Sequence, residues 1–132
     1  MKTNIPKDAL ILVADGQKAL LLRNDGGADG VRLREEQRLS PKNLLDDGPS
    51  GSRPEEQTGS QTDEATFSKQ ITKELYALLQ RRDFEALVLV ADPQTLGQLR
   101  DAMHKEVARS IVLTIDKDLT NHSLPEIARA LN

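Results

Sequence analysis

Four aspartates follow apolar segments of the sequence and could act together as metal ligands. They are Asp15, Asp92, Asp116 and Asp118. Carboxylates suit Mg²⁺, and two such ions could clamp the attacking and leaving oxygens of a phosphodiester. Each aspartate also has a local explanation, because aspartate is common in tight turns, at helix N-caps and in polar loops. We therefore predict no metal ligands and keep a metal-dependent nuclease only as an alternative hypothesis.

Other catalytic constellations lack their expected context. The 132 residues include no cysteine, which excludes a disulfide scaffold, a thiolate zinc site and a cysteine nucleophile. His104 and His122 are the two histidines, and neither has a partner at ligand spacing. No Gly-x-Ser-x-Gly elbow follows a strand. The sequence predicts no catalytic residues and no cofactor, and it favours a binding or regulatory protein over an enzyme.

The charge distribution bears on the class of partner. The net charge is −3, but the segment 40–64 alone carries −4, which leaves +1 for the rest of the chain. With one Tyr, two Phe and no Trp, the folded part offers neither a strong phosphate field nor a platform for stacked bases. We expect a protein partner, with nucleic acid or the ribosome as the alternative. No apolar run approaches the ~20 residues that cross a bilayer, so we expect no membrane contact, a cytoplasmic location and a monomer.

Apolar periodicity predicts five strands and three helices. The expected strands span about residues 9–14, 18–23, 31–39, 86–91 and 111–115, and the expected helices about 64–82, 92–105 and 123–131. Asp15-Gly16 predicts a tight hairpin, because both residues tolerate positive φ. Between Ser40 and Glu64, ten of 25 residues are Gly, Pro or Ser, which predicts a flexible loop at about 40–64.

The order of elements, β-β-β-α-β-α-β-α, predicts the sheet topology. Right-handed crossovers place the fourth and fifth strands parallel to the first, in spatial order 3-2-1-4-5, with helices on both faces. This is a single α/β domain over residues 1–132, a three-layer fold of ribonuclease H-like topology. In such sheets ligands gather beyond the carboxyl ends of the parallel strands. We call the polar residues expected there the strand-end rim, and they are Asp15, Asp92, Lys117, Asp118, Thr120 and Asn121.

Three stretches of sequence resemble a known family. They are Val13–Gly16 with Ala19, the run Phe84–Arg100, which contains Pro93-Gln94-Thr95-Leu96-Gly97-Gln98-Leu99-Arg100, and Ile115–Asn121, which contains Lys117-Asp118-Leu119-Thr120. Together they resemble the bacterial host attachment protein family over nearly the whole chain. The resemblance implies a role in attachment to host surfaces, exerted through partners. It brings no accepted catalytic residues to this sequence.

The order of elements is also similar, more remotely, to the middle domain of eukaryotic and archaeal peptide-chain release factors. In that domain a loop before the long helix presents a Gly-Gly-Gln tripeptide, and the corresponding residues here are Gly59-Ser60-Gln61. Gln61 is therefore the candidate loop residue. Serine at the second position adds a Cβ where the motif needs backbone freedom, which argues against peptidyl-tRNA hydrolysis.

Overall fold

A five-stranded mixed sheet forms the centre of the molecule. The structure is a computed structural model that describes residues 5–26, 30–40 and 60–131. The strands are β1 (Leu10–Ala14), β2 (Ala19–Asn24), β3 (Leu33–Leu39), β4 (Leu87–Ala91) and β5 (Ile111–Ile115). Their spatial order is β3-β2-β1-β4-β5. β1 pairs antiparallel with β2 and parallel with β4, β2 pairs antiparallel with β3, and β4 pairs parallel with β5. The predicted order and strand directions are confirmed.

The two central strands owe their position to their unbroken apolar sequences. Every residue of β1 and of β4 is buried. Leu12 and Leu89 belong to the core on one face of the sheet, and Val13 and Val90 belong to the core on the other. A strand that is apolar on both sides is stable only where both faces are covered, which is why these two strands lie in the middle.

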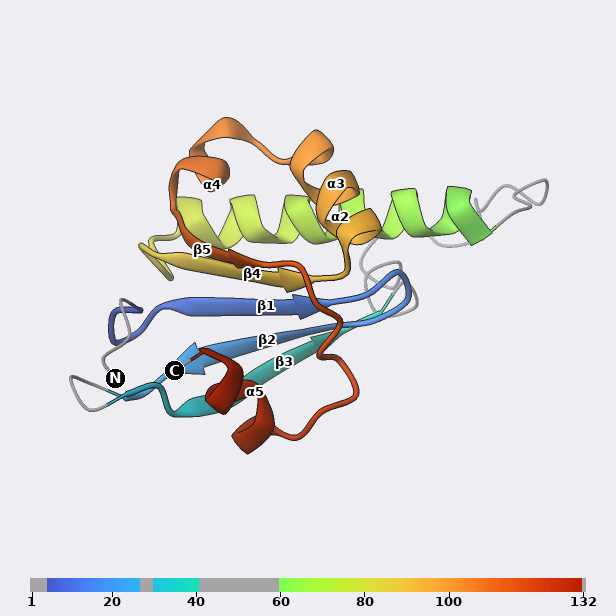
Figure 1. Cartoon of the computed structure of the whole chain (residues 1–132). Helices are drawn as coiled ribbons and strands as arrows, with labels where there is room; N and C mark the ends of the chain where they lie inside the picture. Colours follow the sequence, from blue (N-terminus) through green and yellow to red (C-terminus); the bar gives the residue numbers. More distant parts are fainter. Residues whose placement is uncertain (1–4, 27–29, 41–59, 132) are drawn as a thin grey trace.

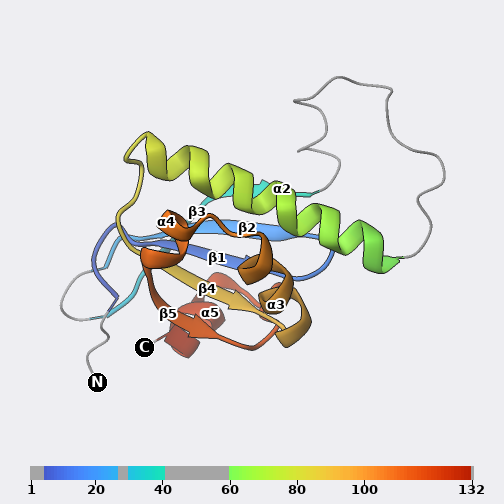
Figure 2. The ribbon, with the colours of Figure 1, turned by 90° about the horizontal axis from the view of Figure 1, so that it is seen from above.

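Helices cover the two faces unequally. α2 (Ser60–Gln80), α3 (Pro93–Ala102) and α4 (Lys105–Arg109) lie on one face, and the short α5 (Leu124–Leu131) lies on the other (Figures 1 and 2). We call these the α2 face and the α5 face. In Figure 2 α2 runs across the sheet as the longest helix. Within the described ranges, no helix is long and apolar enough to cross a membrane.

The first long helix begins earlier than the sequence predicts. Its expected bounds were 64–82, whereas α2 spans Ser60–Gln80, so residues 60–64 are helical rather than part of a loop. Phe67 and Ile71 are buried in the core and anchor the helix. Once a helix is anchored, further turns form at little cost, and acidic residues near its start favour the helix dipole. The predicted loop over residues 41–59 lies outside the described residues.

The segment 92–105, predicted as one helix, divides into two elements. α3 ends at Ala102, and Met103 and His104 have extended backbone before α4 begins at Lys105. Nδ1 of His104 accepts a hydrogen bond from the backbone N–H of Glu106 at 3.1 Å, so the histidine acts as N-cap of α4. Its ring also stacks on Tyr76, with ring centroids 4.0 Å apart. These two contacts give His104 a structural role.

Candidate functional site

The turn between β1 and β2 holds Asp15 in a fixed orientation. Its Oδ1 accepts hydrogen bonds from the backbone N–H groups of Gln17 and Lys18, both at 2.8 Å. Neither Asp15 nor Gly16 has positive φ, so the predicted use of left-handed backbone is wrong and the aspartate side chain closes the turn instead. A Cβ at Gly16 would lie 2.5 Å from Cδ of Glu64, so the glycine lets the first turns of α2 approach the hairpin closely.

The strand-end rim brings Asp15 and Asp118 together through Thr120. Oγ1 of Thr120 lies 2.7 Å from Oδ1 of Asp118 and 3.0 Å from Oδ2 of Asp15, a residue 105 positions earlier in the chain. The Thr120 side chain is buried, and its backbone N–H also donates to Asp118. A hydroxyl has one proton, so it can donate to only one of these carboxylates at a time. The pair therefore keeps an acceptor oxygen open to a hydrogen-bond donor.

The same contacts change the acidity of Asp118. The hydrogen bond from the Thr120 hydroxyl is the largest cause that lowers the pKa of Asp118 below its usual 3.8, and burial acts in the opposite direction. The Thr120 backbone N–H and the charge of Lys18 lower the pKa further. Asp118 therefore remains a carboxylate at every physiological pH.

Removing the Thr120 hydroxyl should reverse this effect. In Thr120→Val we expect the pKa of Asp118 to rise, whereas Thr120→Ser keeps the hydroxyl and should leave it low. Carboxyl ¹³C shifts followed over a pH titration measure both. A depressed pKa stabilises the fold above the usual value near 3.8 and that contribution is lost as the pH falls through the folded-state value, so the two variants should differ in stability at pH 7 and converge in acid. Equal Asp118 titration curves in the two variants would contradict the assignment.

The other rim residues are placed less tightly. Nζ of Lys18 donates to Oδ1 of Asn121 at 2.6 Å, which joins Asn121 to the hairpin. Asp92 instead caps α3, since its carboxylate accepts from the backbone N–H and the hydroxyl of Thr95 at 3.1 and 2.7 Å. No hydrogen bond or ion pair joins Lys117 to another described residue. The geometry therefore groups Asp15, Asp118, Thr120 and Asn121, and separates Asp92 and Lys117 from them.

The structure also shows the position of the candidate loop residue Gln61 and bears on the alternative of a metal site at the rim. Gln61, expected in a loop, has its backbone in the first turn of α2. A metal centre at the rim would need more carboxylates than converge there, because Asp92 is held by its own helix. In the part of the chain that the structure describes, no group of three or more His, Cys, Asp or Glu side chains could hold a metal ion.

A buried arginine makes a second cluster that the sequence did not reveal. Only 7% of the Arg23 side chain is exposed, and its guanidinium donates to the carbonyl oxygens of Asp8 and Asp83 and to the carboxylates of Asp83 and Glu36. Burial alone would lower the pKa of Arg23, but the hydrogen bonds to Glu36 and Asp83 outweigh it and raise the pKa. This cluster lies at the opposite end of β1 from the rim, and its bonds are internal, so it stabilises the fold.

A groove beside α2 is the second surface that carries polar groups without partners among the described residues. Its cavity of about 510 Å³ is lined by Thr66, Lys69, Gln70, Thr72, Lys73 and Ala102, and we call it the α2 groove. The side-chain oxygen of Gln70 is buried there without a hydrogen-bond partner among the described residues. Lys69 and Lys73 are exposed and lie one turn apart, and neither forms an ion pair with another described residue. The groove therefore combines two unneutralised cations with an unfilled acceptor.

Comparison with known proteins places the chain in a family. The model of "Bacterial archaeo-eukaryotic release factor family 12" matches residues 8–131, which include every described strand and helix. The chain belongs to this release factor family. Family 12 membership confirms the release-factor relation inferred from the sequence and gives no support to the host attachment name.

Two other comparisons add little to the family 12 assignment. A search of curated proteins found no match. A solved structure described as "Archaeal protein" is similar with a TM-score of 0.47 and 10% identity, over 92% of this chain and 36% of that one. The chain thus spans about a third of the length of that protein.

Proposed function

We propose that this protein is a ribosome-associated, release-factor-like domain that acts by binding. The observation that carries the proposal is the match to a release factor family over residues 8–131. A ribosomal partner implies a cytoplasmic location, as expected from the sequence. Any effect on attachment to host surfaces would then be indirect, through the synthesis of other proteins.

Binding rather than peptidyl-tRNA hydrolysis is proposed because of Ser60. The Gly-Gly-Gln tripeptide needs backbone freedom at its second position, and serine restricts that freedom. Here Ser60 begins α2 and Gln61 lies in its first helical turn. A metal-dependent nuclease is the weaker alternative, because Asp92 caps α3 and only Asp15 and Asp118 meet at the rim.

The α2 groove is the surface that we assign to ribosomal RNA. Binding to RNA depends on cations that can neutralise phosphates. Outside the groove, on edge strand β3, Arg34 and Arg38 are already ion-paired, with Asp25, Glu36 and Glu35. Lys69 and Lys73 are exposed and available for phosphates.

The strand-end rim is assigned to a protein partner at the same location. Two carboxylates that share one hydroxyl proton favour a ligand with N–H donors, such as a lysine or arginine side chain. Asn121 and Lys117 would extend this surface, with Asp92 at its border. Anionic RNA is disfavoured here, because Asp15 and Asp118 would repel its phosphates.

Sedimentation of the full chain with purified ribosomes tests the proposal. We expect wild type to pellet with ribosomes and to dissociate as salt is raised. Lys69→Gln with Lys73→Gln should weaken binding about tenfold, or about 1.4 kcal/mol. The control, Arg34→Gln with Arg38→Gln, changes the net charge equally on edge strand β3, outside the groove, and should bind like wild type.

A second arm of the same experiment examines the rim. Asp15→Asn with Asp118→Asn should also weaken association, although the change makes the chain less acidic and would strengthen a purely electrostatic attraction to RNA. Tighter binding of this variant would remove the rim from the interface. Wild type that stays in the supernatant at every salt concentration would overturn the proposed function itself.

A further inference from the structure

The two edges of the sheet differ in their exposed side chains. β3 presents charged residues, of which Arg34 and Arg38 form ion pairs with neighbouring acids. β5 presents apolar ones, because 49% of Val112 and 36% of Leu113 is exposed. They are the exposed large hydrophobic residues of the described chain. Charged side chains protect a free edge from association, whereas apolar side chains invite it, so β5 is the edge suited to a partner.

The pairing of β5 explains why two successive apolar residues reach the surface. The register with β4 shifts after Leu87, so that Leu87 pairs with Ile111 and Val88 with Leu113. Val112 is the extra residue of this bulge. Leu113 and Ile115 then lie beside Val88 and Val90, whose side chains belong to the core of the α5 face.

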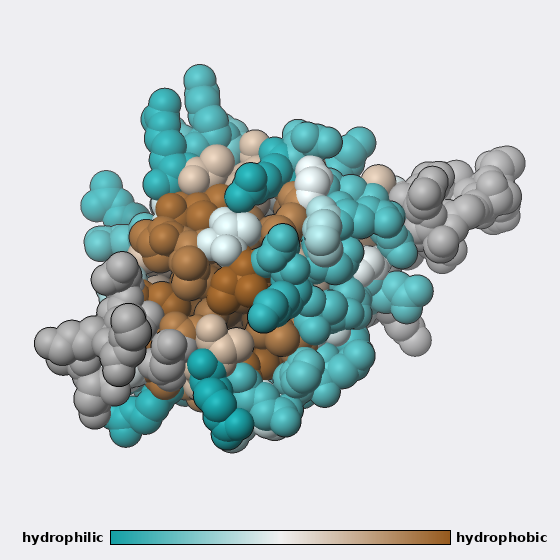
Figure 3. Space-filling model, viewed as in Figure 1, coloured by the Kyte–Doolittle hydropathy of each residue, from teal (hydrophilic) through white to brown (hydrophobic). Residues whose placement is uncertain are grey.

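On that face β5 is only partly covered, because Leu113 remains exposed. α5 contacts β3, and in the view of Figure 1 it is drawn over β2 and β3. In Figure 3 the hydrophobic residues form one continuous area on the side of the molecule that carries β5. An apolar area with a polar rim is typical of an interaction surface.

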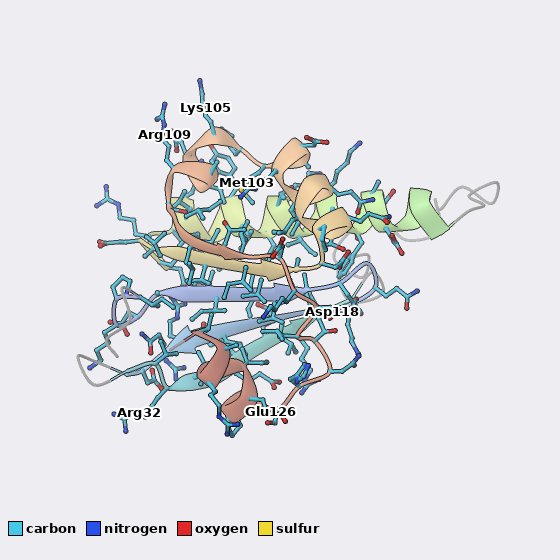
Figure 4. All side chains as sticks on the ribbon, in the orientation of Figure 1. Arg32, Met103, Lys105, Arg109, Asp118 and Glu126 are labelled. Carbon is cyan, nitrogen blue, oxygen red and sulfur yellow. The ribbon has the colours of Figure 1, made fainter. Side chains whose placement is uncertain are left out.

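Charges of opposite sign flank this strand. Lys105, Glu106 and Arg109 precede β5 and sum to +1, whereas Asp116, Lys117 and Asp118 follow it and sum to −1. In Figure 4 Lys105 and Arg109 point into solvent at one end of the molecule, and Asp118 lies at the other end of the strand. Arg109 and Asp116 are exposed and form no ion pair with other described residues.

We infer that a second copy of this chain covers the β5 edge, antiparallel to the first, in a two-fold symmetric dimer. A two-fold axis near Leu113 places Ile111 of one copy beside Ile115 of the other and Val112 beside Thr114. The same axis brings the end of each strand that carries a net charge of +1, with Lys105, Glu106 and Arg109, to the end of its partner that carries −1, with Asp116, Lys117 and Asp118. Such an isologous contact needs one surface that is complementary to itself, which this sequence of apolar and charged residues provides. The bulge interrupts the backbone edge, so side chains rather than a regular ladder make the contact.

Sedimentation velocity of the full chain over a range of concentrations tests the dimer. We expect wild type to show a species of twice the monomer mass as concentration rises. Val112→Glu introduces a carboxylate at the centre of the contact, and the affinity should fall at least about tenfold. Val112 is already half exposed, so this variant should keep its far-UV circular dichroism spectrum and its midpoint of unfolding.

Charge reversals determine the orientation. Arg109→Glu alone and Asp116→Lys alone should each dimerise less than wild type, because each brings like charges together at both ends of the contact. An equimolar mixture of the two variants should dimerise again. In the mixed dimer the end with the introduced carboxylate would meet the end with the introduced ammonium group, and the two native ends would meet at the other side of the contact. A wild type that is monomeric at about 1 mM, where even weak dimers are populated, overturns the inference. A dimer insensitive to Val112→Glu, or a mixture without recovery, overturns it as well.

Discussion

Leu89→Ala is expected to lower the free energy of unfolding by about 3 kcal/mol, because it opens a cavity in the middle of the sheet. Leu89 is fully buried in β4, between β1 and β5, and packs into the core under the α2 face. Urea denaturation followed by circular dichroism measures the change. Leu113→Ala is the matched control on the neighbouring strand. Leu113 is 36% exposed, so its truncation should cost less than about 1 kcal/mol.

The comparison of these two leucines examines the packing directly. If Leu113→Ala were as destabilising as Leu89→Ala in a monomeric sample, β5 would be covered within a single chain. The exposed edge, and the contact inferred from it, would then be wrong.

Arg23→Met is expected to destabilise the protein by about 2–3 kcal/mol, although methionine has a similar length. Removal of one partner of a buried ion pair typically costs about 3–5 kcal/mol, and we reduce this because 43% of Asp83 and 26% of Glu36 is exposed to solvent. The carbonyl oxygens of Asp8 and Asp83 also lose their donor. Chemical denaturation with a check of constant m-value provides the measurement.

Arg34→Met is the control for this prediction. The Arg34 side chain is 54% exposed, and its ion pairs with Asp25 and Glu36 lie at the surface. Surface pairs contribute at most about 1 kcal/mol. If both substitutions lowered the free energy of unfolding by a similar amount, burial would not strengthen the ion pairs of Arg23.

The central part of the fold could be predicted because it depends on strong local patterns. Unbroken apolar runs at 10–14 and 87–91 need cover on two faces, and the right-handed crossover rule then fixes the strand order. The break at His104 could not be predicted in this way. Leu96, Leu99, Met103 and Val107 continue the helical spacing across it, so the periodicity contains no sign of the extended residues between α3 and α4.

The strand-end rule indicated where the rim lies but not which of its residues contact one another. Asp15, Asp92 and Asp118 all follow strands that end at one edge, and in the structure Asp15 and Asp118 both contact Thr120. The same rule placed Asp92 with them, whereas the structure uses it to cap α3. Asp92 with Pro93 was itself a helix-start signal, so two local patterns competed and the cap prevailed.

The α2 groove and the Arg23 cluster depend on contacts between distant segments. The groove joins Lys69 and Lys73 to Ala102, and the cluster joins Arg23 to Asp83. A single charged residue directly after four apolar residues of β2 was the available signal for the cluster. No periodicity in the sequence indicates that the middle of α2 meets the end of α3 at the groove.

Site-specific photocrosslinking on the ribosome tests the central claim most directly. A photoreactive amino acid would replace Lys73 in the α2 groove in one sample and Arg34 on edge strand β3, outside the groove, in another. After irradiation with purified ribosomes, the account predicts a ribosomal RNA crosslink from position 73 and at most a trace from position 34. Equal crosslinking from both positions, or none from position 73, would contradict it.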